Sequence, residues 1–237
     1  MELIKVDKLT KKYRDVLALN EVSLNIEEGN LYGLLGVNGA GKTTLIKILS
    51  GLTRKTSGNA YVKGYSLDEM DEIKKIVDIS PQEVAVALNL TVYENLLFFQ
   101  ELYGKKDKDY LDDVIHSLGL NDVLKKKAKT LSGGYQRRLS IAIGLMSKPE
   151  ILFLDEPTLG LDVISRRELW NIIRKLKGKI TIILTSHYLE EIEALCDKIS
   201  VMSKGNILFE GTVDEIKEKT NEDSFEEAFI KIVGGNN

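Results

Sequence analysis

A glycine-rich segment from Gly36 to Thr44 carries the clearest chemical pattern in the sequence. It fits the G-x-x-x-x-G-K-[ST] pattern of a phosphate-binding loop. Its glycines can adopt positive φ, so several backbone N–H groups can converge on one anion. We expect a helix to begin near Lys42, whose ammonium would reach the β- and γ-phosphates of a nucleoside triphosphate, while the Thr43 hydroxyl would bind Mg²⁺. The loop residues expected to bind the nucleotide are Gly36, Asn38, Gly39, Ala40, Gly41, Lys42, Thr43 and Thr44.

Two adjacent carboxylates, Asp155 and Glu156, follow the continuous apolar run Ile151–Leu154. Such a run is typical of a central parallel strand, which would place both acids at the carboxyl edge of a sheet. There Asp155 would hold Mg²⁺, directly or through water, and Glu156 would act as a general base toward an attacking water. The alternative is an acidic pair that only caps a helix.

Gln82 and His187 also stand where short apolar runs end, after residues 76–79 and 180–184. Because the carboxyl ends of parallel strands share one edge, we expect both side chains to face the same crevice as the acidic pair. There His187 could donate a hydrogen bond to a γ-phosphate. Gln82 equally fits a solvated loop glutamine. The second histidine, His116, falls within an expected helix and is interpreted as structural or solvated.

A second glycine-containing segment, Leu131 to Arg138, reads LSGGYQRR, and in it Ser132 is a good N-cap for a helix. Gly133 and Gly134 in the first helical turn cost about 1 kcal/mol each, so something should need a close approach to the backbone. An anion at the helix N-terminus would explain both glycines. Since this turn is expected to lie too far from Lys42 to share its nucleotide, the anion would come from a second copy, with two chains enclosing two nucleotides head to tail.

Tyr13 is expected in a polar turn between two alternating strands, residues 3–10 and 16–26. Its ring could stack on a flat group such as adenine. The alternative is an aromatic side chain that covers the edge of a sheet.

Strand and helix patterns alternate along most of the chain, which predicts an α/β fold with a mainly parallel sheet and an N-terminal antiparallel β subdomain. Residues 83–130 lack a strand pattern, so we expect them to form an inserted helical lobe. The nucleotide-binding core would then comprise residues 1–82 and 131–237, with a hairpin at residues 199–209. The expected helices after the phosphate loop are residues 45–49, 68–75, 91–103, 107–119, 121–127, 131–147, 163–177, 214–220 and 225–233.

Composition narrows the setting of the protein. The 237 residues carry a net charge of −3, which gives no overall bias toward nucleic acid. A single cysteine, Cys196, cannot form an intrachain disulfide, so a reduced, cytosolic setting is expected. No run approaches the roughly 18 apolar residues that a membrane-spanning helix needs, so we expect a protein that is soluble by itself.

Taken together, these motifs resemble the ATP-binding cassette of ABC transporters over nearly the whole chain. The resemblance implies ATP and Mg²⁺ as cofactors, adenine stacking on Tyr13, and contact of Gln82 with both Mg²⁺ and the attacking water. It also implies that Ser132 and Gly134 bind the γ-phosphate of an ATP held by another subunit, and that Asp162 communicates across the dimer interface. The residues assigned to this second nucleotide-binding surface are Ser132, Gly133, Gly134, Gln136 and Asp162.

The family resemblance predicts an ATP-hydrolysing subunit that dimerises and drives a membrane permease carried on a separate chain. Residues Leu131 to Gln136 correspond to the signature segment of the family. Tyr135 in this signature and the turn Leu159–Asp162 look like the cassettes of two-component exporters of drugs, antibiotics or lipids. The protein would then sit in the cytoplasm, peripheral on the inner face of the membrane. The alternatives are a non-transport cassette acting on nucleic acid or ribosomes, which the short lobe without heptads disfavours, and a small-molecule kinase, which leaves the LSGGYQ segment unexplained.

A permease helix is expected to dock between core and lobe, over residues 84–90 and part of residues 91–103. Phe98 and Phe99 are adjacent in that helix and cannot both face one core, so one should lie on an exposed apolar patch. The alternative is that both are partly buried within the lobe.

Overall fold

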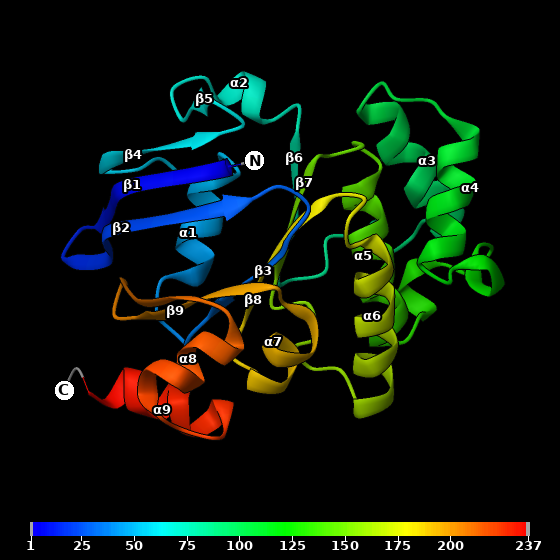
Figure 1. The fold of residues 1–237 in the computed structure, drawn as a ribbon. Coiled ribbons are helices and arrows are strands. Elements are labelled where there is room, and N and C mark those ends of the chain that lie inside the picture. The colour runs from blue at the N-terminus through cyan, green and yellow to red at the C-terminus, as the bar shows by residue number, and fades with distance from the viewer. Residues whose placement is uncertain (1, 236–237) are drawn as a thin grey trace.

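The computed structural model describes residues 2–235, and two β-sheets organise this part of the chain (Figure 1). The N-terminal sheet is antiparallel, with strand order β2-β1-β4-β5. Its strands are β1 (Glu2–Tyr13), β2 (Val16–Glu27), β4 (Ser57–Val62) and β5 (Tyr65–Ser66). Apolar side chains alternate with polar ones along β1 and β2, because one face of this sheet packs on the core while the other meets solvent. The predicted antiparallel β subdomain is therefore confirmed.

The second sheet is mainly parallel and has the order β10-β9-β3-β8-β7-β6. Only the edge pair β9–β10, the predicted hairpin, is antiparallel. Strands β3, β7 and β8 are buried along their whole length, as continuous apolar runs at the centre of a parallel sheet should be. Their bounds are β3 (Leu31–Leu35), β6 (Val77–Ser80), β7 (Ile151–Asp155), β8 (Thr181–Ser186), β9 (Lys198–Ser203) and β10 (Asn206–Gly211).

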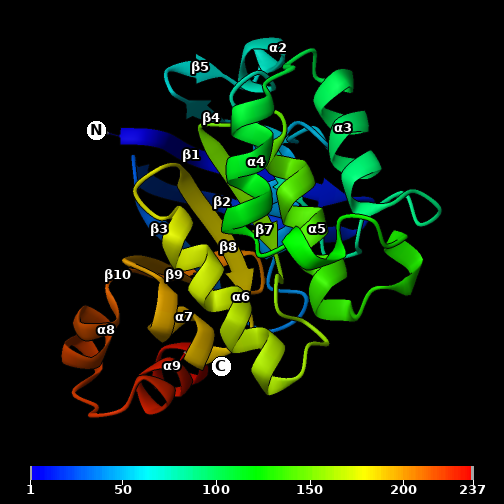
Figure 2. The same ribbon diagram turned by 90° about the vertical axis from the view of Figure 1, so that its right-hand side faces the viewer.

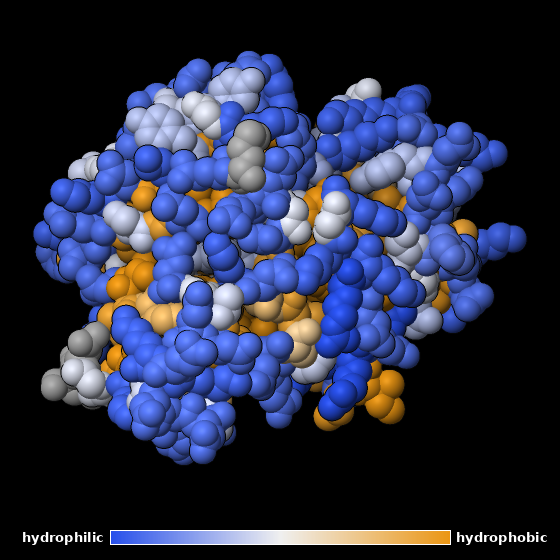
Figure 3. All heavy atoms as spheres, viewed as in Figure 1, coloured by the Kyte–Doolittle hydropathy of each residue, from blue (hydrophilic) through white to orange (hydrophobic). Residues whose placement is uncertain are grey.

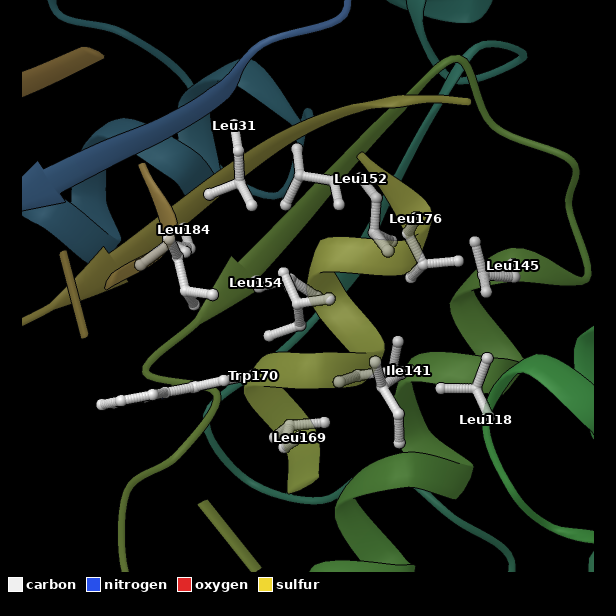
Figure 4. Close-up of a cluster of buried hydrophobic side chains, with 14 of the residues drawn as sticks. Leu31, Leu118, Ile141, Leu145, Leu152, Leu154, Leu169, Trp170, Leu176 and Leu184 are labelled. Atoms are coloured by element: carbon white, nitrogen blue, oxygen red, sulfur yellow. The ribbon is translucent and has the colours of Figure 1, made fainter. Parts of the chain in front are cut away.

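Helices cover both faces of the parallel sheet and divide the apolar interior into two cores. Helix α1 packs between the two sheets in one core, with β1, β2 and β4. The other core joins the opposite face of the parallel sheet to helices α5 and α6, and its leucines meet Trp170 there (Figure 4). The helices of the core are α1 (Lys42–Leu49), α2 (Met70–Ile73), α5 (Gly133–Leu145), α6 (Val163–Leu176), α7 (Leu189–Leu195), α8 (Val213–Thr220) and α9 (Phe225–Gly234).

Residues 83–130, which the sequence argument expects to form a helical lobe, contain α3 (Val92–Leu102) and α4 (Lys108–Ser117), which stand beside α5 (Figure 2). Thr91 begins α3 with the predicted capping box, since Thr91 accepts from the Glu94 N–H and Glu94 accepts from the Thr91 N–H. His116 is exposed near the end of α4, as the solvated interpretation requires. Within the described residues, no helix is long and apolar enough to cross a membrane.

Two predicted helices are wrong or shortened. Residues 121–127 form only a 3₁₀ turn, Asn121–Val123, because the chain that follows bonds its backbone to the start of α3. The Val92 N–H donates to Lys126 O at 3.0 Å, and the Ala128 N–H donates to Leu90 O at 2.9 Å. The polar helix predicted at residues 68–75 shrinks to the single turn α2. In the first case tertiary backbone hydrogen bonds replace the local ones that a helix would need.

Candidate functional site

A cleft of about 560 Å³ opens where β3, β6, β7 and β8 end, within the size range of small-molecule sites. It brings together side chains that the sequence places far apart and assigns to one nucleotide. The cleft is lined by Tyr13, Val16, Leu17, Ala18, Asn38, Gly39, Ala40, Gly41, Lys42, Thr43, Thr44, Gln82, Glu156, Leu159, His187 and Lys204. Gln82 and His187 line this cleft together with Glu156, whereas Asp155, which was expected to face the same crevice, is buried and is not among the described residues that line it.

The glycine-rich loop has the backbone that an anion cradle requires. Gly39 and Gly41 have φ of +81° and +108°, in the region that favours glycine. A Cβ on Gly36 would lie 2.4 Å from Met202 O, so only glycine fits where the loop crosses β9. Helix α1 begins at Lys42 as predicted, and its free N–H groups open toward the cleft.

The Lys42 ammonium is buried at the centre of this arrangement. Its Nζ donates to Gly36 O at 2.5 Å and lies 3.3 Å from Glu156 Oε1. Both side chains are less than a tenth exposed, so solvent screens the pair little. A triphosphate that takes Lys42 must therefore compete with the carboxylate of Glu156.

Asp155 is held by two hydroxyl groups behind the loop. Its Oδ1 accepts from Thr43 Oγ1 at 3.0 Å and from Thr185 Oγ1 at 2.6 Å. The Thr185 hydroxyl oxygen in turn accepts from the Glu156 N–H at 2.9 Å, which fixes both acids to the end of β8. A hydroxyl and a carboxylate side by side are the hard oxygen donors that Mg²⁺ prefers, and Mg²⁺ commonly binds one or two carboxylates together with substrate phosphates. The donor set therefore fits this ion without a larger cluster of acids.

Glu156 uses its two carboxylate oxygens toward two different partners. Oε1 faces Lys42, and Oε2 lies 2.8 Å from Nδ1 of His187. The residue has a φ of +48°, uncommon for a residue with a Cβ, and it turns the side chain back into the cleft. A carboxylate, an imidazole and an ammonium thus meet at the end of the buried strand β7.

The signature residues lie on a different part of the surface. Ser132 is the N-cap of α5, and Asp162 caps α6 by accepting from the N–H groups of Ile164 and Ser165. Neither they nor Gly133, Gly134 and Gln136 are among the described residues that line the cleft. The structure therefore separates the two predicted groups of nucleotide-binding residues, as the sequence argument expects.

Two signature residues have structural roles that the sequence argument did not foresee. A Cβ on Gly134 would lie 3.0 Å from Ser165 Oγ, so this glycine allows α5 to approach α6. Gln136 Nε2 donates to Ala128 O at 3.0 Å, which ties α5 to the end of the lobe. A Cβ on Gly133 would meet no atom closer than 3.9 Å, so packing accounts for Gly134 but not for Gly133.

The expected position of Tyr13 needs correction. Tyr13 is the last residue of β1 and pairs with Val16 across the hairpin, so it does not lie in a turn. The hairpin is tighter than expected because β1 and β2 extend almost to its tip. The ring is 43% exposed, lines the cleft, and has the Lys11 ammonium 4.6 Å from its centre.

Sequence reasoning missed four residues at or behind the cleft: Lys204, Thr185, Arg137 and Glu191. Lys204 sits in the β9–β10 turn, and the hairpin pattern gave no hint that this turn lines the cleft. Thr185 looked like one more residue of a buried strand. Burial lowers the pKa of the Arg137 guanidinium to about 10, and burial raises the pKa of Glu191, which accepts from Trp170 Nε1 at 3.1 Å. None of these contacts has a local sequence signal.

Comparison with known proteins extends these observations. A family model described as "ABC transporter" matches residues 19–159, more than half of the chain. The chain is 40% identical to the phospholipid-transporting ATPase ABCA3 of Homo sapiens over 91% of its own length, but it covers only 13% of that protein. It is 38% identical to the linearmycin resistance ATP-binding protein LnrL of Bacillus subtilis, over 90% of this chain and 70% of LnrL.

Solved structures with the same fold agree with these relatives. The ATP-binding subunit of an ABC transporter superposes with a TM-score of 0.86 and 26% identity, covering 97% of this chain and 99% of that one. A dimeric ATP-binding cassette bound to ADP and Pi superposes with a TM-score of 0.77 and 25% identity, over 89% of this chain and 98% of that one.

Proposed function

Because this chain belongs to the ABC transporter family, we propose that it is an ATPase whose cleft binds MgATP and that hydrolysis there drives a separate membrane permease. The observation that carries the proposal is the meeting of Lys42, Glu156 and His187 at the mouth of the phosphate loop. This arrangement supplies a cation for the phosphates, a base for water and an imidazole beside that base.

The side chains of the cleft divide the steps of the proposed reaction among them. Lys42 binds the β- and γ-phosphates, and Gln82 orients the attacking water. Glu156 takes a proton from that water while the water oxygen bonds to the γ-phosphorus and the bond from that phosphorus to ADP breaks. His187 lies against the Glu156 carboxylate, and on ATP binding its ring N–H donates to the γ-phosphate instead. Thr43 and Asp155 would hold Mg²⁺, which would supply charge neutralisation at the phosphate oxygens.

The remaining loop residues and Tyr13 bind the nucleotide without taking part in proton transfer. The N–H groups of Asn38 to Thr44 surround the phosphates, and the exposed Tyr13 ring stacks on adenine. We infer that residues 83–130 act as a lobe beside the core formed by residues 1–82 and 131–237, and that the lobe continues into α5, the helix that begins with Gly133 and Gly134.

A second copy of the cassette completes each site in this proposal. Ser132, Gly133 and Gly134 lie outside the cleft of their own chain, so they would bind the γ-phosphate held by the partner. Apolar side chains support an interface beside them, since Val163 and Ile164 are 68% and 73% exposed at the start of α6. Figure 3 shows apolar atoms projecting from this end of α6 among polar surroundings. The two-fold partner is either an identical chain or a paralogue.

Relatives favour export as the direction of transport. LnrL is named as a resistance protein and ABCA3 as a phospholipid-transporting ATPase, and the chain spans 70% and 13% of their respective lengths. We therefore propose that the chain serves an exporter and works at the cytoplasmic face of the membrane. The permease would dock beside residues 84–90 and α3, where Val84, Leu88 and Phe98 are 38%, 52% and 51% exposed.

Mixed dimers test whether each ATP is bound between the phosphate loop of one chain and the signature of the other. A Lys42→Ala chain and a Ser132→Ala chain, each inactive alone, are combined, and ATP hydrolysis is measured. The composite dimer retains one intact site, made of Lys42 from one chain and Ser132 from the other, and should recover part of the activity. Recovery would fail if both residues served the same nucleotide.

Phe98→Asp tests the docking surface. Phe98 is half exposed, whereas Phe99 packs against the core of the lobe and would report on folding instead. Phe98→Asp should abolish transport and leave basal ATP hydrolysis intact. Ile230→Asp is the matched control, because Ile230 is 53% exposed on α9, and the control should leave both activities intact. Unchanged transport in Phe98→Asp would refute this surface.

A further inference from the structure

A buried arginine on α5, the helix that begins in the signature, binds two segments at once: the segment that carries Gln82 and the segment that carries Glu156. Arg137 is 3% exposed, and its guanidinium donates to four backbone carbonyls. Nη1 donates to Pro81 O and to Gln82 O, the latter at 3.3 Å. On the other side, Nη2 donates to Asp155 O at 2.6 Å and Nε donates to Pro157 O at 2.8 Å. The carbonyls that flank Glu156 are therefore tied through one side chain to the backbone of Gln82.

Arginine suits this position because its planar fork presents five N–H donors in a fixed geometry. A lysine at the same position has donors at a single nitrogen and cannot span two segments on opposite sides. Burying a cation is costly unless charges and hydrogen bonds compensate it. Here Asp155, Glu191 and Glu156 all favour the charged guanidinium, although burial lowers its pKa to about 10. The side chain therefore stays charged at neutral pH and keeps all its donors.

The position of Arg137 in α5 connects these carbonyls to the signature turn. Arg137 lies five residues after Ser132, roughly 7.5 Å along one rigid helix. Helix α5 also packs against α3 and α4 of the helical lobe. A displacement of α5, whether it starts in the lobe or at Ser132, must carry the guanidinium with it and pull on both catalytic segments.

We propose that Arg137 is a positioning residue that couples movement of the signature helix to the placement of Gln82 and Glu156 together. The inference rests on the proposed ATPase site, because it explains how contacts made at Ser132 reach the base and the glutamine of the same chain. Arg137 is not among the described residues that line the cleft. It acts through backbone carbonyls of the two segments that carry the side chains of Gln82 and Glu156.

Steady-state kinetics of Arg137→Lys test the inference. ATP binding should not weaken, because Lys42 and the loop keep their own contacts with the nucleotide, while kcat should fall about 10²-fold, as a misplacement near 1 Å does in other sites. Arg174→Lys is the matched control, since Arg174 also donates to a backbone carbonyl, Ala194 O, but lies on the surface between α6 and α7. The control should keep the wild-type kcat. A wild-type kcat in a folded Arg137→Lys chain would overturn the proposal.

Chemical rescue separates coupling from loss of structure. In Arg137→Ala, free guanidinium ion can enter the vacated space and restore the donors, but it cannot restore the covalent link to α5. Guanidinium chloride at a non-denaturing concentration, with sodium chloride as the salt control, should therefore recover the thermal midpoint more than kcat. Full recovery of kcat would show that α5 need not pull on the carbonyls and would overturn coupling.

A measurement on the native arginine keeps the inference testable if neither variant folds. Hydrogen exchange is followed in the Glu156→Gln chain, with and without MgATP, over peptides containing residues 82–83 and 156–159. Coupling predicts that protection of both segments changes with the same ATP midpoint, and independent midpoints would refute it. Should the wild-type chain itself not hydrolyse ATP, the proposed function fails instead, which keeps the two failures distinct.

Discussion

Replacement of Glu156 by glutamine should change both the rate of ATP hydrolysis and the affinity for ATP. The amide keeps the shape of the carboxylate but cannot take a proton, so kcat should fall by roughly 10²–10⁴ if Glu156 is the general base. The affinity change comes from Lys42, whose ammonium lies 3.3 Å from Glu156 Oε1 in a buried pair. ATP has to replace this contact in the native protein and need not replace it in the variant.

The size of the affinity change follows from the geometry of that pair. At 3.3 Å and an effective dielectric constant near 20, the Coulomb attraction is about 5 kcal/mol before desolvation is subtracted. Hydrogen bonds to charged groups retain a net worth of about 1.5–3 kcal/mol in proteins. Removing the competing carboxylate should therefore tighten ATP binding by roughly ten- to hundredfold.

Calorimetric titration with MgATP measures this change, provided that dimer closure is kept out of it. Titrations over a series of protein concentrations are extrapolated to the dilute limit, at which closure contributes nothing to the apparent affinity. Glu150→Gln is the matched control, because Glu150 comes directly before β7 as Glu156 comes directly after it. Glu150 also pairs with a lysine, Lys63, but both side chains of that pair are 40% exposed. An exposed pair contributes little, so the control should bind ATP as the native chain does.

Two results would refute separate parts of this reasoning. If the Glu156→Gln chain binds ATP with the native affinity in the dilute limit but no longer hydrolyses it, the Lys42–Glu156 pair does not compete with ATP binding. Native turnover in Glu156→Gln would instead remove Glu156 from the role of base.

Three further changes test the surroundings of the site. Thr185→Val removes the hydroxyl between Asp155 Oδ1 and the backbone of the next residue, so it should destabilise the protein by about 1–3 kcal/mol and raise the Mg²⁺ concentration needed for hydrolysis, as urea unfolding and Mg²⁺ titration would show. In Glu191→Gln, the pH dependence of stability should flatten: burial raises the pKa of Glu191, so the native chain binds more protons than the unfolded one and loses stability as pH rises above the unfolded pKa near 4.5 and through the raised folded value. In thermal melts from pH 4 to 8, the melting temperature of the variant should rise relative to that of the native chain as the pH approaches neutral. Parallel plots of melting temperature against pH would contradict the raised pKa of Glu191. Gly134→Ala should lower the melting temperature because its Cβ meets α6, whereas Gly133→Ala should preserve it and still reduce hydrolysis; loss of stability in both would leave the signature turn a packing feature only.

The chemistry of the protein was largely predictable from local sequence. The phosphate loop, the acidic end of β7 and the residues Gln82 and His187 each follow a buried strand, and parallel strands must bring their carboxyl ends to one edge. Alternation and capping patterns likewise predicted the antiparallel sheet and helix α3 with its capping box. Boundaries failed where backbone groups found partners elsewhere, as in residues 121–127 beside the start of α3.

The sequence by itself determined which chemical groups this protein possesses and at which edge of its sheet they gather, because strand and loop patterns are local. Only the tertiary structure decided how those groups are held. Arg137 reaches carbonyls 56 and 18 residues away, and Lys42 meets a carboxylate that follows a different strand. Every residue has a carbonyl, so no pattern of side chains indicates which ones a buried arginine will bind; that choice depends on the packing of α5 between the lobe and the sheet.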